Sequence, residues 1–168
     1  MIFETTVPQS LPLLPPLDGI LAKIKPFCDA KKIEPDVLLN SRLAADQFNF
    51  IRQVQIATDS AKIGIARATG KDAPPHDDKE TTVEQLQTRI KETVKYLSTI
   101  TEKDLAGASE RRITTPRWEG KTLSGHEYLI QHSTPNTYFH ITVAYEILRH
   151  NGLDVGKKDY LGPMPFKA

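Results

Sequence analysis

The sequence predicts an all-α fold, a bundle of four helices, and two observations support this. In four stretches of the chain, apolar residues recur at steps of three and four, which is the spacing of one face of a helix. Most of these stretches are bounded by helix signals: a proline or a capping box at the start, or a glycine just past the end. A chain of 168 residues suits one core, so we predict a single domain over residues 1–168.

The chain is expected to open with an extended lead-in over residues 1–16. Prolines there lack a backbone donor and restrict the residue before them, so no regular helix is expected before about residue 16. These prolines are Pro8, Pro12, Pro15 and Pro16. The first helix is then predicted from Leu17 to Cys28, with Pro26 kinking it or removing one of its hydrogen bonds.

A second, long helix is predicted from about Ala44 to Thr69, closed by Gly70. A short turn after Pro35 precedes it. Its apolar face carries Phe50, Val54, Ala57, Ala61, Ile65 and Ala68. The three alanines on this face predict the close approach of a neighbouring helix.

A third helix follows a polar, proline-bearing loop over residues 70–78, in which His76 is expected to be solvated. Thr81 or Thr82 can cap this helix, because a Glu or Gln lies three residues further on in each case. Its apolar face repeats at helical steps through Val83, Leu86, Ile90, Val94, Leu97 and Ile100. This is the clearest amphipathic helix in the sequence.

The segment from Glu102 to Leu123 predicts a small hairpin or an ordered loop between the third and fourth helices. Trp118, the one tryptophan, is expected to pack this segment onto the helices, and a stacking platform for a ligand is the alternative.

The last helical region opens with a capping box at Ser124 and Glu127. We expect a short helix to about His132, a kink at Pro135, and a long helix that ends at Arg149 or His150 before Asn151-Gly152. The tail over residues 153–168 is expected to be irregular and to wrap the bundle.

Composition excludes several classes of partner. The 22 basic and 21 acidic residues leave a net charge of +1 without any block of like charges, which argues against binding to nucleic acid or to an anionic membrane. No run of 18 apolar residues exists, so no segment is predicted to span a membrane. A single cysteine, Cys28, fits a reducing compartment, and we expect the protein to be cytoplasmic.

The candidate site lies on the last helix. His140 falls inside its apolar arc, and Asn136 lies one turn earlier at the border of that arc. A buried imidazole needs polar partners from another helix. The sequence offers Asp46, Gln47 and Gln53 on the second helix and does not decide among them. The arrangement predicts either a core histidine satisfied by such a partner or a ligand to a metal.

Several segments of the sequence resemble a family of small helical proteins within the DinB/YfiT-like superfamily of four-helix bundles. These segments are Leu38-Leu39-Asn40-Ser41-Arg42-Leu43-Ala44, Arg52-Gln53-Val54-Gln55-Ile56-Ala57, Pro135-Asn136, Phe139-His140 and residues 144–152. The resemblance covers roughly residues 6–162. It implies a DinB-like bundle as the fold.

Many members of that superfamily hold a divalent metal, zinc or nickel, with three histidines, and several branches are thiol-dependent transferases. The resemblance places His140 on the second histidine of the last helix and Asn136 on the first. The histidine of the second helix has no counterpart, because no histidine precedes Gly70. Asp46, Gln47 or Gln53 would stand in its place.

Three functions follow as expectations. The first is a non-catalytic member with a polar pocket for a small molecule, formed by Asp46, Gln47, Gln53, Asn136 and His140. The second is a metal-dependent transferase or hydrolase, with zinc or nickel held by His140, Asn136 and Asp46 and activating a bound water. The third is a structural module that forms a homodimer.

Overall fold

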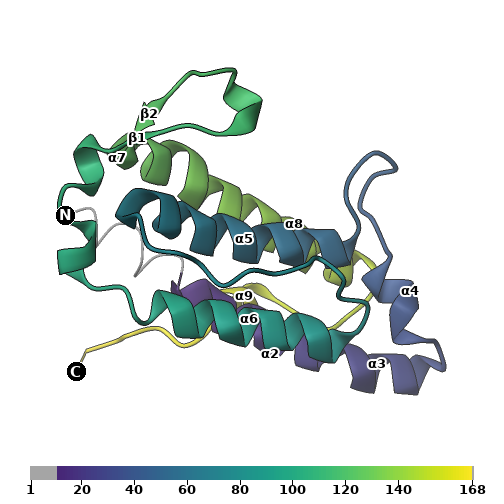
Figure 1. Cartoon of the computed structure of the whole chain (residues 1–168). Coiled ribbons are helices and arrows are strands. Elements are labelled where there is room, and N and C mark those ends of the chain that lie inside the picture. The colour runs from purple at the N-terminus through teal and green to yellow at the C-terminus, as the bar shows by residue number, and fades with distance from the viewer. Residues whose placement is uncertain (1–10, 168) are drawn as a thin grey trace.

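The computed structural model describes residues 11–167 and confirms the all-α four-helix bundle. The first helix comes in two parts, α2 (Leu14–Ala22) and α3 (Ile24–Lys31), followed by the short α4 (Pro35–Leu39). The long helices α5 (Phe50–Thr69), α6 (Val83–Leu97) and α8 (Thr134–His150) complete the bundle. Helix α5 packs against both α8 and α6, and α2 closes the bundle against α6 and α8 (Figure 1).

The first helix begins earlier and breaks earlier than predicted. A 3-10 turn, η1 (Leu11–Leu13), leads directly into α2 at Leu14, so the extended lead-in predicted up to residue 16 is wrong for residues 11–16. Pro15 and Pro16 fit there because the first amides of a helix have no intrahelical partner. The break falls at Lys23, since Pro26 has no N–H for the preceding turn. The lead-in over residues 1–10 lies outside the described residues.

The second helix begins at Phe50 rather than at Ala44. Asn49 is its N-cap, and the Asn49 side chain accepts a hydrogen bond from the Arg52 amide at 3.0 Å. Residues 40–49 form a loop instead, closed by a hydrogen bond from the Phe50 amide to the Ser41 carbonyl at 3.0 Å. The other end agrees with the prediction, because Gly70 takes a left-handed conformation with φ of 76°.

A long crossover, residues 71–82, connects α5 to α6. It returns along α5, since His76 pairs with Lys62 while Asp78 and Glu80 pair with Arg52 and Gln55, nearer the start of that helix. Helices α5 and α6 therefore run in the same direction, as Figure 1 shows. The predicted capping box forms between Thr82 and Gln85.

The segment before the last helix contains the predicted hairpin. Strand β1 (Arg112–Ile113) pairs antiparallel with β2 (Leu123–Ser124), and a 3-10 turn, η4 (Pro116–Trp118), lies between them. Trp118 packs this hairpin onto the helices, as expected, through edge-on contacts with the rings of Tyr128 and His132.

Where a kink at Pro135 was predicted, the structure has a π-helical turn just before Pro135 and a continuous helical path. The capping box of Ser124 and Glu127 opens the short α7 (Gly125–Glu127). A π-helical turn, η5 (Tyr128–Ser133), then leads without interruption into α8. Such π turns re-aim the side chains on one face of a helix, and they are frequent at functional sites.

The tail is more regular than predicted. Helix α9 (Lys157–Leu161) forms within it and packs against α2, so the predicted irregular tail is wrong for these residues. An ion pair at 2.6 Å between Lys23 and Asp159 fastens the two helices. Among the residues described, 11–167, no helix is both long enough and apolar enough to cross a lipid bilayer.

Candidate functional site

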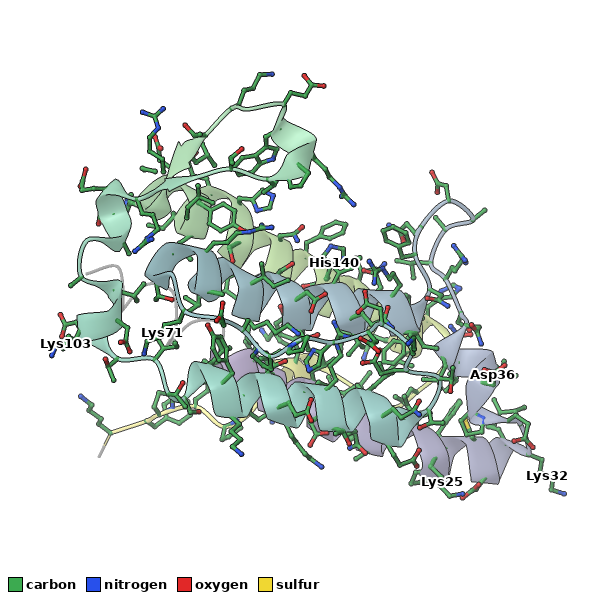
Figure 2. The ribbon with its side chains drawn as sticks, in the orientation of Figure 1. Lys25, Lys32, Asp36, Lys71, Lys103 and His140 are labelled. Atoms are coloured by element: carbon green, nitrogen blue, oxygen red, sulfur yellow. The ribbon has the colours of Figure 1, made fainter. Side chains whose placement is uncertain are left out.

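His140 lies on the face of α8 that meets α5 (Figure 2). Its side chain is buried, with 8% of the residue exposed. The Nδ1 atom lies 2.6 Å from Oε1 of Gln53, which is itself buried on α5. The amide nitrogen of Gln53 in turn donates to the backbone carbonyl of Phe48 at 3.1 Å. Gln53 is therefore the partner from the second helix that a buried imidazole requires.

These contacts determine the tautomer of His140. The carbonyl of Phe48 can only accept a hydrogen bond, so the Gln53 amide must turn its nitrogen toward Phe48 and its oxygen toward the imidazole. The oxygen also only accepts, so Nδ1 of His140 carries the proton and Nε2 does not. Burial, with a contribution from the nearby Arg52 charge, lowers the pKa of His140 from 6.5 to about 4. The ring is neutral at pH 7.

Asn136 is held one turn before His140 by the same neighbouring helix. Its side-chain nitrogen donates to Oγ of Ser60 at 2.6 Å, and Oγ of Ser133 donates to the Ser60 carbonyl at 2.8 Å. Gly64 makes this approach possible. A Cβ at Gly64 would lie 1.8 Å from Oγ of Ser133, far inside contact distance.

The structure separates the predicted pocket residues into two groups. Gln53, Asn136 and His140 lie at the interface of α5 and α8. Asp46 and Gln47 lie in the loop before α5, with Asp46 exposed. The prediction that placed them on the second helix is wrong, because that helix begins only at Phe50. Gln47 is half-buried, and its Oε1 has no hydrogen-bond partner within residues 11–167.

The residues at these positions do not fit a zinc or nickel centre. Such centres take imidazole, thiolate or carboxylate ligands, and here one imidazole stands among amides and hydroxyls. No group of three His, Cys, Asp or Glu side chains able to hold a metal occurs in the described part of the chain.

A cavity of about 300 Å³ opens beside this interface. We call it the arginine cleft, because Arg52 and Arg67 of α5 and Arg117 of the hairpin all line it. The other lining residues are Asp59, Ser60, Tyr128, His132 and Ser133, together with the apolar Phe48, Ile56 and Ile63. Ser60 accepts the hydrogen bond of Asn136 and Ser133 bonds to the Ser60 carbonyl, so the cleft adjoins the predicted site.

The hairpin side of the arginine cleft is an aromatic cluster. Tyr128 and His132 stack with their ring centroids 5.3 Å apart, and Trp118 contacts both edge-on. Arg67 donates to the Tyr128 hydroxyl at 2.9 Å and lies 6.0 Å from the centre of its ring. Burial, and then the Arg67 charge, lower the pKa of His132, which favours its neutral form. The sequence analysis did not include His132 among the candidate site residues.

A second polar network, which the sequence analysis missed, lies between α5, α6 and the crossover. Its centre is Arg89, with only 1% of the residue exposed. The guanidinium donates to the carboxylates of Asp59, Asp78 and Glu80 at 2.6, 2.8 and 2.9 Å. It also donates to Oγ of Thr58 at 2.7 Å. The available signal was that Arg89 falls three residues after Leu86, within the apolar stripe of α6.

His76 belongs to this network, and the expectation that it is solvated is wrong. Its side chain is only 6% exposed. Lys62, with 2% exposed, donates to Nδ1 of His76, and Nε2 of His76 donates to Glu92 at 3.0 Å. Burial, followed by the charges of Lys62 and Arg89, lowers the pKa of His76.

A shallower cavity of about 400 Å³ lies over this network, on α6 and the crossover. The charged groups of the network that reach it, Arg89, Glu80 and His76, are already engaged with other protein groups. The arginine cleft differs in this respect. Within residues 11–167, Arg117 makes no hydrogen bond or ion pair with another residue, and the one hydrogen bond of the Arg67 side chain goes to the neutral hydroxyl of Tyr128.

Comparisons with known proteins agree on the family. Residues 2–161 match the family model described as domain of unknown function DUF1993. A solved structure described as that of a DinB family member protein from Shewanella denitrificans is 56% identical to the chain, with a TM-score of 0.95. The alignment covers 100% of this chain and 96% of that one. No match is found among curated proteins. The chain therefore belongs to the DUF1993 family of DinB-like helical bundles.

Proposed function

We propose that the protein binds a small organic molecule in the arginine cleft, and that the His140–Gln53 pair supports the wall of this cleft instead of holding a metal. The observation that carries the proposal is the convergence of polar side chains from α5, the hairpin and η5 on one cavity. Its volume of about 300 Å³ is at the lower end of the range for ligand sites, which suits a small ligand.

The pair of His140 and Gln53 supports this division of roles. Gln53 bonds to the carbonyl of Phe48, and Phe48 lines the arginine cleft. Asn136 likewise fixes Ser60, another lining residue. Positions that the superfamily resemblance assigns to metal ligands therefore hold the walls of the cavity here. A wall held by buried hydrogen bonds keeps the cavity in one shape, which lowers the entropic cost of binding.

Trp118 provides the experiment. It is the one tryptophan of the chain and contacts two residues that line the arginine cleft, so a ligand there should change its fluorescence. Millimolar organic anions and their neutral amide counterparts would be screened by Trp118 fluorescence and thermal shift on the full chain. Ile63→Phe should fill the cleft and weaken binding, whereas Ile33→Phe, on the exposed Ile33, should leave binding unchanged. Absence of any binding, or binding unaffected by Ile63→Phe, would contradict the proposal.

Metal-dependent transfer or hydrolysis is the second candidate, and one observation favours it. Nε2 of His140 carries no proton, so it has the lone pair that a metal requires. Titration of tag-free protein with zinc and with nickel, followed by calorimetry, tests it. Stoichiometric binding that is lost in His140→Gln would support the metal alternative and count against our assignment of the pair.

Homodimer formation is the third candidate. Val37, Phe48 and Phe139 are apolar side chains more than half exposed. Size-exclusion chromatography with light scattering tests it, and a monomer at high micromolar concentration would exclude it.

A further inference from the structure

Charge is distributed unevenly in the arginine cleft. Three guanidinium groups and one carboxylate, that of Asp59, line it. Asp59 is already neutralised by Arg89 at 2.6 Å and by Lys62 at 3.1 Å. Arg52 is neutralised by its ion pair with Asp78. The charge without a partner in the described structure therefore belongs to Arg67 and Arg117.

These two arginines come from different walls. Arg67 lies near the end of α5, and Arg117 lies in η4 between the two strands of the hairpin. Within the described residues, the Arg67 guanidinium donates one hydrogen bond, and the acceptor is the neutral hydroxyl of Tyr128. A half-buried guanidinium next to apolar and aromatic side chains favours an anion, because water cannot fully solvate it there.

We propose that the ligand of the arginine cleft is a small carboxylic acid with an apolar body, bound as its anion, with the carboxylate between Arg67 and Arg117. This inference rests on the proposed function. The fork of a guanidinium matches the two oxygens of a carboxylate, and two such groups from different elements of one cavity can bind the same carboxylate.

The rest of the cleft accounts for the apolar body. Ile56, Ile63 and Phe48 supply aliphatic and aromatic surface. The stacked rings of Tyr128 and His132 supply a flat face on the hairpin side. With about 300 Å³ available, the body is a branched aliphatic chain or a single ring.

A carboxylate fits better than a phosphate. No lysine lines the cavity, and its lining includes the apolar or aromatic side chains of Phe48, Ile56, Ile63 and Tyr128. No glycine-rich phosphate-cradling loop occurs in the sequence either. Burying a doubly charged phosphate monoester beside these apolar side chains would cost more hydration free energy than burying a singly charged carboxylate.

The test compares matched probes on the full chain by Trp118 fluorescence and calorimetry. Isovalerate, benzoate and phenylacetate form the acid set, and isovaleramide, benzamide and phenylacetamide are their neutral isosteres. Phenyl phosphate tests the alternative anion. We expect at least one acid to bind, about tenfold or more tightly than its amide, since a charge-assisted hydrogen bond is worth this factor. Phenyl phosphate is expected to bind more weakly than that acid.

Arginine variants locate the carboxylate. Arg67→Gln and Arg117→Gln are each expected to weaken binding of the acid about tenfold, with little effect on any binding of the amide. Arg117 is exposed, so Arg117→Gln keeps the experiment informative if Arg67→Gln folds poorly. Arg112→Gln is the matched control, because Arg112 lies on the same hairpin but bonds to Thr122 outside the cleft.

The outcomes separate this inference from the proposed function. Equal binding of amides and acids, abolished by Ile63→Phe, would overturn the carboxylate and leave the binding function standing. Tighter binding of phenyl phosphate, or acid binding unaffected by both arginine variants, would also overturn it. If no acid, amide or phosphate binds, both the carboxylate inference and the proposed binding function are wrong.

Discussion

Nδ1 of His140 lies 2.6 Å from Oε1 of Gln53, so a histidine of α8 and a glutamine of α5 hold the two helices together in the core of the bundle. The Gln53 oxygen accepts the hydrogen bond of the His140 N–H, so neither of these buried polar groups is left unpaired. The Gln53 amide also reaches the Phe48 carbonyl, so the pair ties the loop before α5 to the last helix.

Removing Gln53 should therefore destabilise the protein. Gln53→Leu leaves both the imidazole N–H and the Phe48 carbonyl unpaired, and we expect a loss of about 1–3 kcal/mol in the free energy of unfolding. The double variant Gln53→Leu/His140→Leu removes both polar partners, so its loss should be smaller than the sum of the two single losses. Urea denaturation measures all three. Gln131→Leu, at an exposed position, is the control; additive losses would contradict the pairing.

The protonation of His140 gives a prediction for acid stability. The pKa of His140 is about 4 in the folded chain against an ordinary 6.5, so below pH 6.5 the unfolded chain takes up this proton first. Stability should then fall as the pH drops from 6.5 toward 4, by at most about 1.4 kcal/mol for each pH unit from this residue.

NMR titration of the imidazole nitrogens tests this directly. His140 should remain neutral, with Nδ1 protonated, down to about pH 5 in the folded protein, whereas in urea it should titrate near 6.5. A folded-state titration near 6.5, or a proton on Nε2, would show that the Gln53 contact does not control this ring.

Local sequence signals predicted the helices, but not the contacts made across long distances in the chain. The helical arc correctly placed His140 toward the core, and the capping signals at Thr82 and Ser124 formed as expected. The partner of His140 stayed undecided between Asp46, Gln47 and Gln53. Which of the three reaches it depends on where α5 starts, and the Asn49 cap decides that.

The polar network and the cleft depend on the crossover and the hairpin, whose paths periodicity does not encode. His76 is buried because residues 71–82 return along α5, which brings it to Lys62. Arg117 lines the cleft together with residues of α5, and the contacts of Trp118 with Tyr128 and His132 of η5 position the hairpin there. Neither feature follows from the spacing of apolar residues.

Gly64 should be essential to the approach of η5 to α5. Gly64→Ala would place a Cβ 1.8 Å from Oγ and 2.8 Å from Cβ of Ser133, both belonging to a side chain that is itself buried. We expect a loss of about 1–3 kcal/mol, because overpacking forces the two elements apart. Gly19→Ala is the matched control, since nothing lies within 4 Å of its added Cβ in α2. Helix propensity predicts that this control gains up to about 1 kcal/mol.

Thermal unfolding of the two alanine variants provides the comparison. A loss of stability in Gly64→Ala that is partly recovered in Gly64→Ala/Ser133→Gly would confirm that the clash is with Ser133. Equal stability of the two single variants would show that the two elements can separate at no cost.

Arg89 should be the most sensitive charged residue in the protein. Arg89→Met would leave Asp59, Asp78 and Glu80 without their shared partner, and we expect a loss of about 3 kcal/mol or more. Arg112→Met, on an exposed arginine of the hairpin, should change stability by no more than about 0.5 kcal/mol.

The acid dependence of this variant distinguishes lost ion pairs from lost packing. In the native chain, burial raises the pKa of Asp78 and of Glu80, but hydrogen bonds outweigh burial and keep each pKa below its ordinary value. Arg52 and Arg89 donate these bonds to Asp78, and Arg89 is the chief donor to Glu80. These carboxylates therefore add stability at neutral pH that is lost as the pH falls below the ordinary values of 3.8 and 4.5. In Arg89→Met the acid-induced loss should be smaller, because Asp78 and Glu80 lose the hydrogen bonds and the charge of Arg89, while Asp78 keeps Arg52 and Glu80 keeps Gln55. An unchanged acid dependence would mean that Arg89 stabilises the bundle by packing alone.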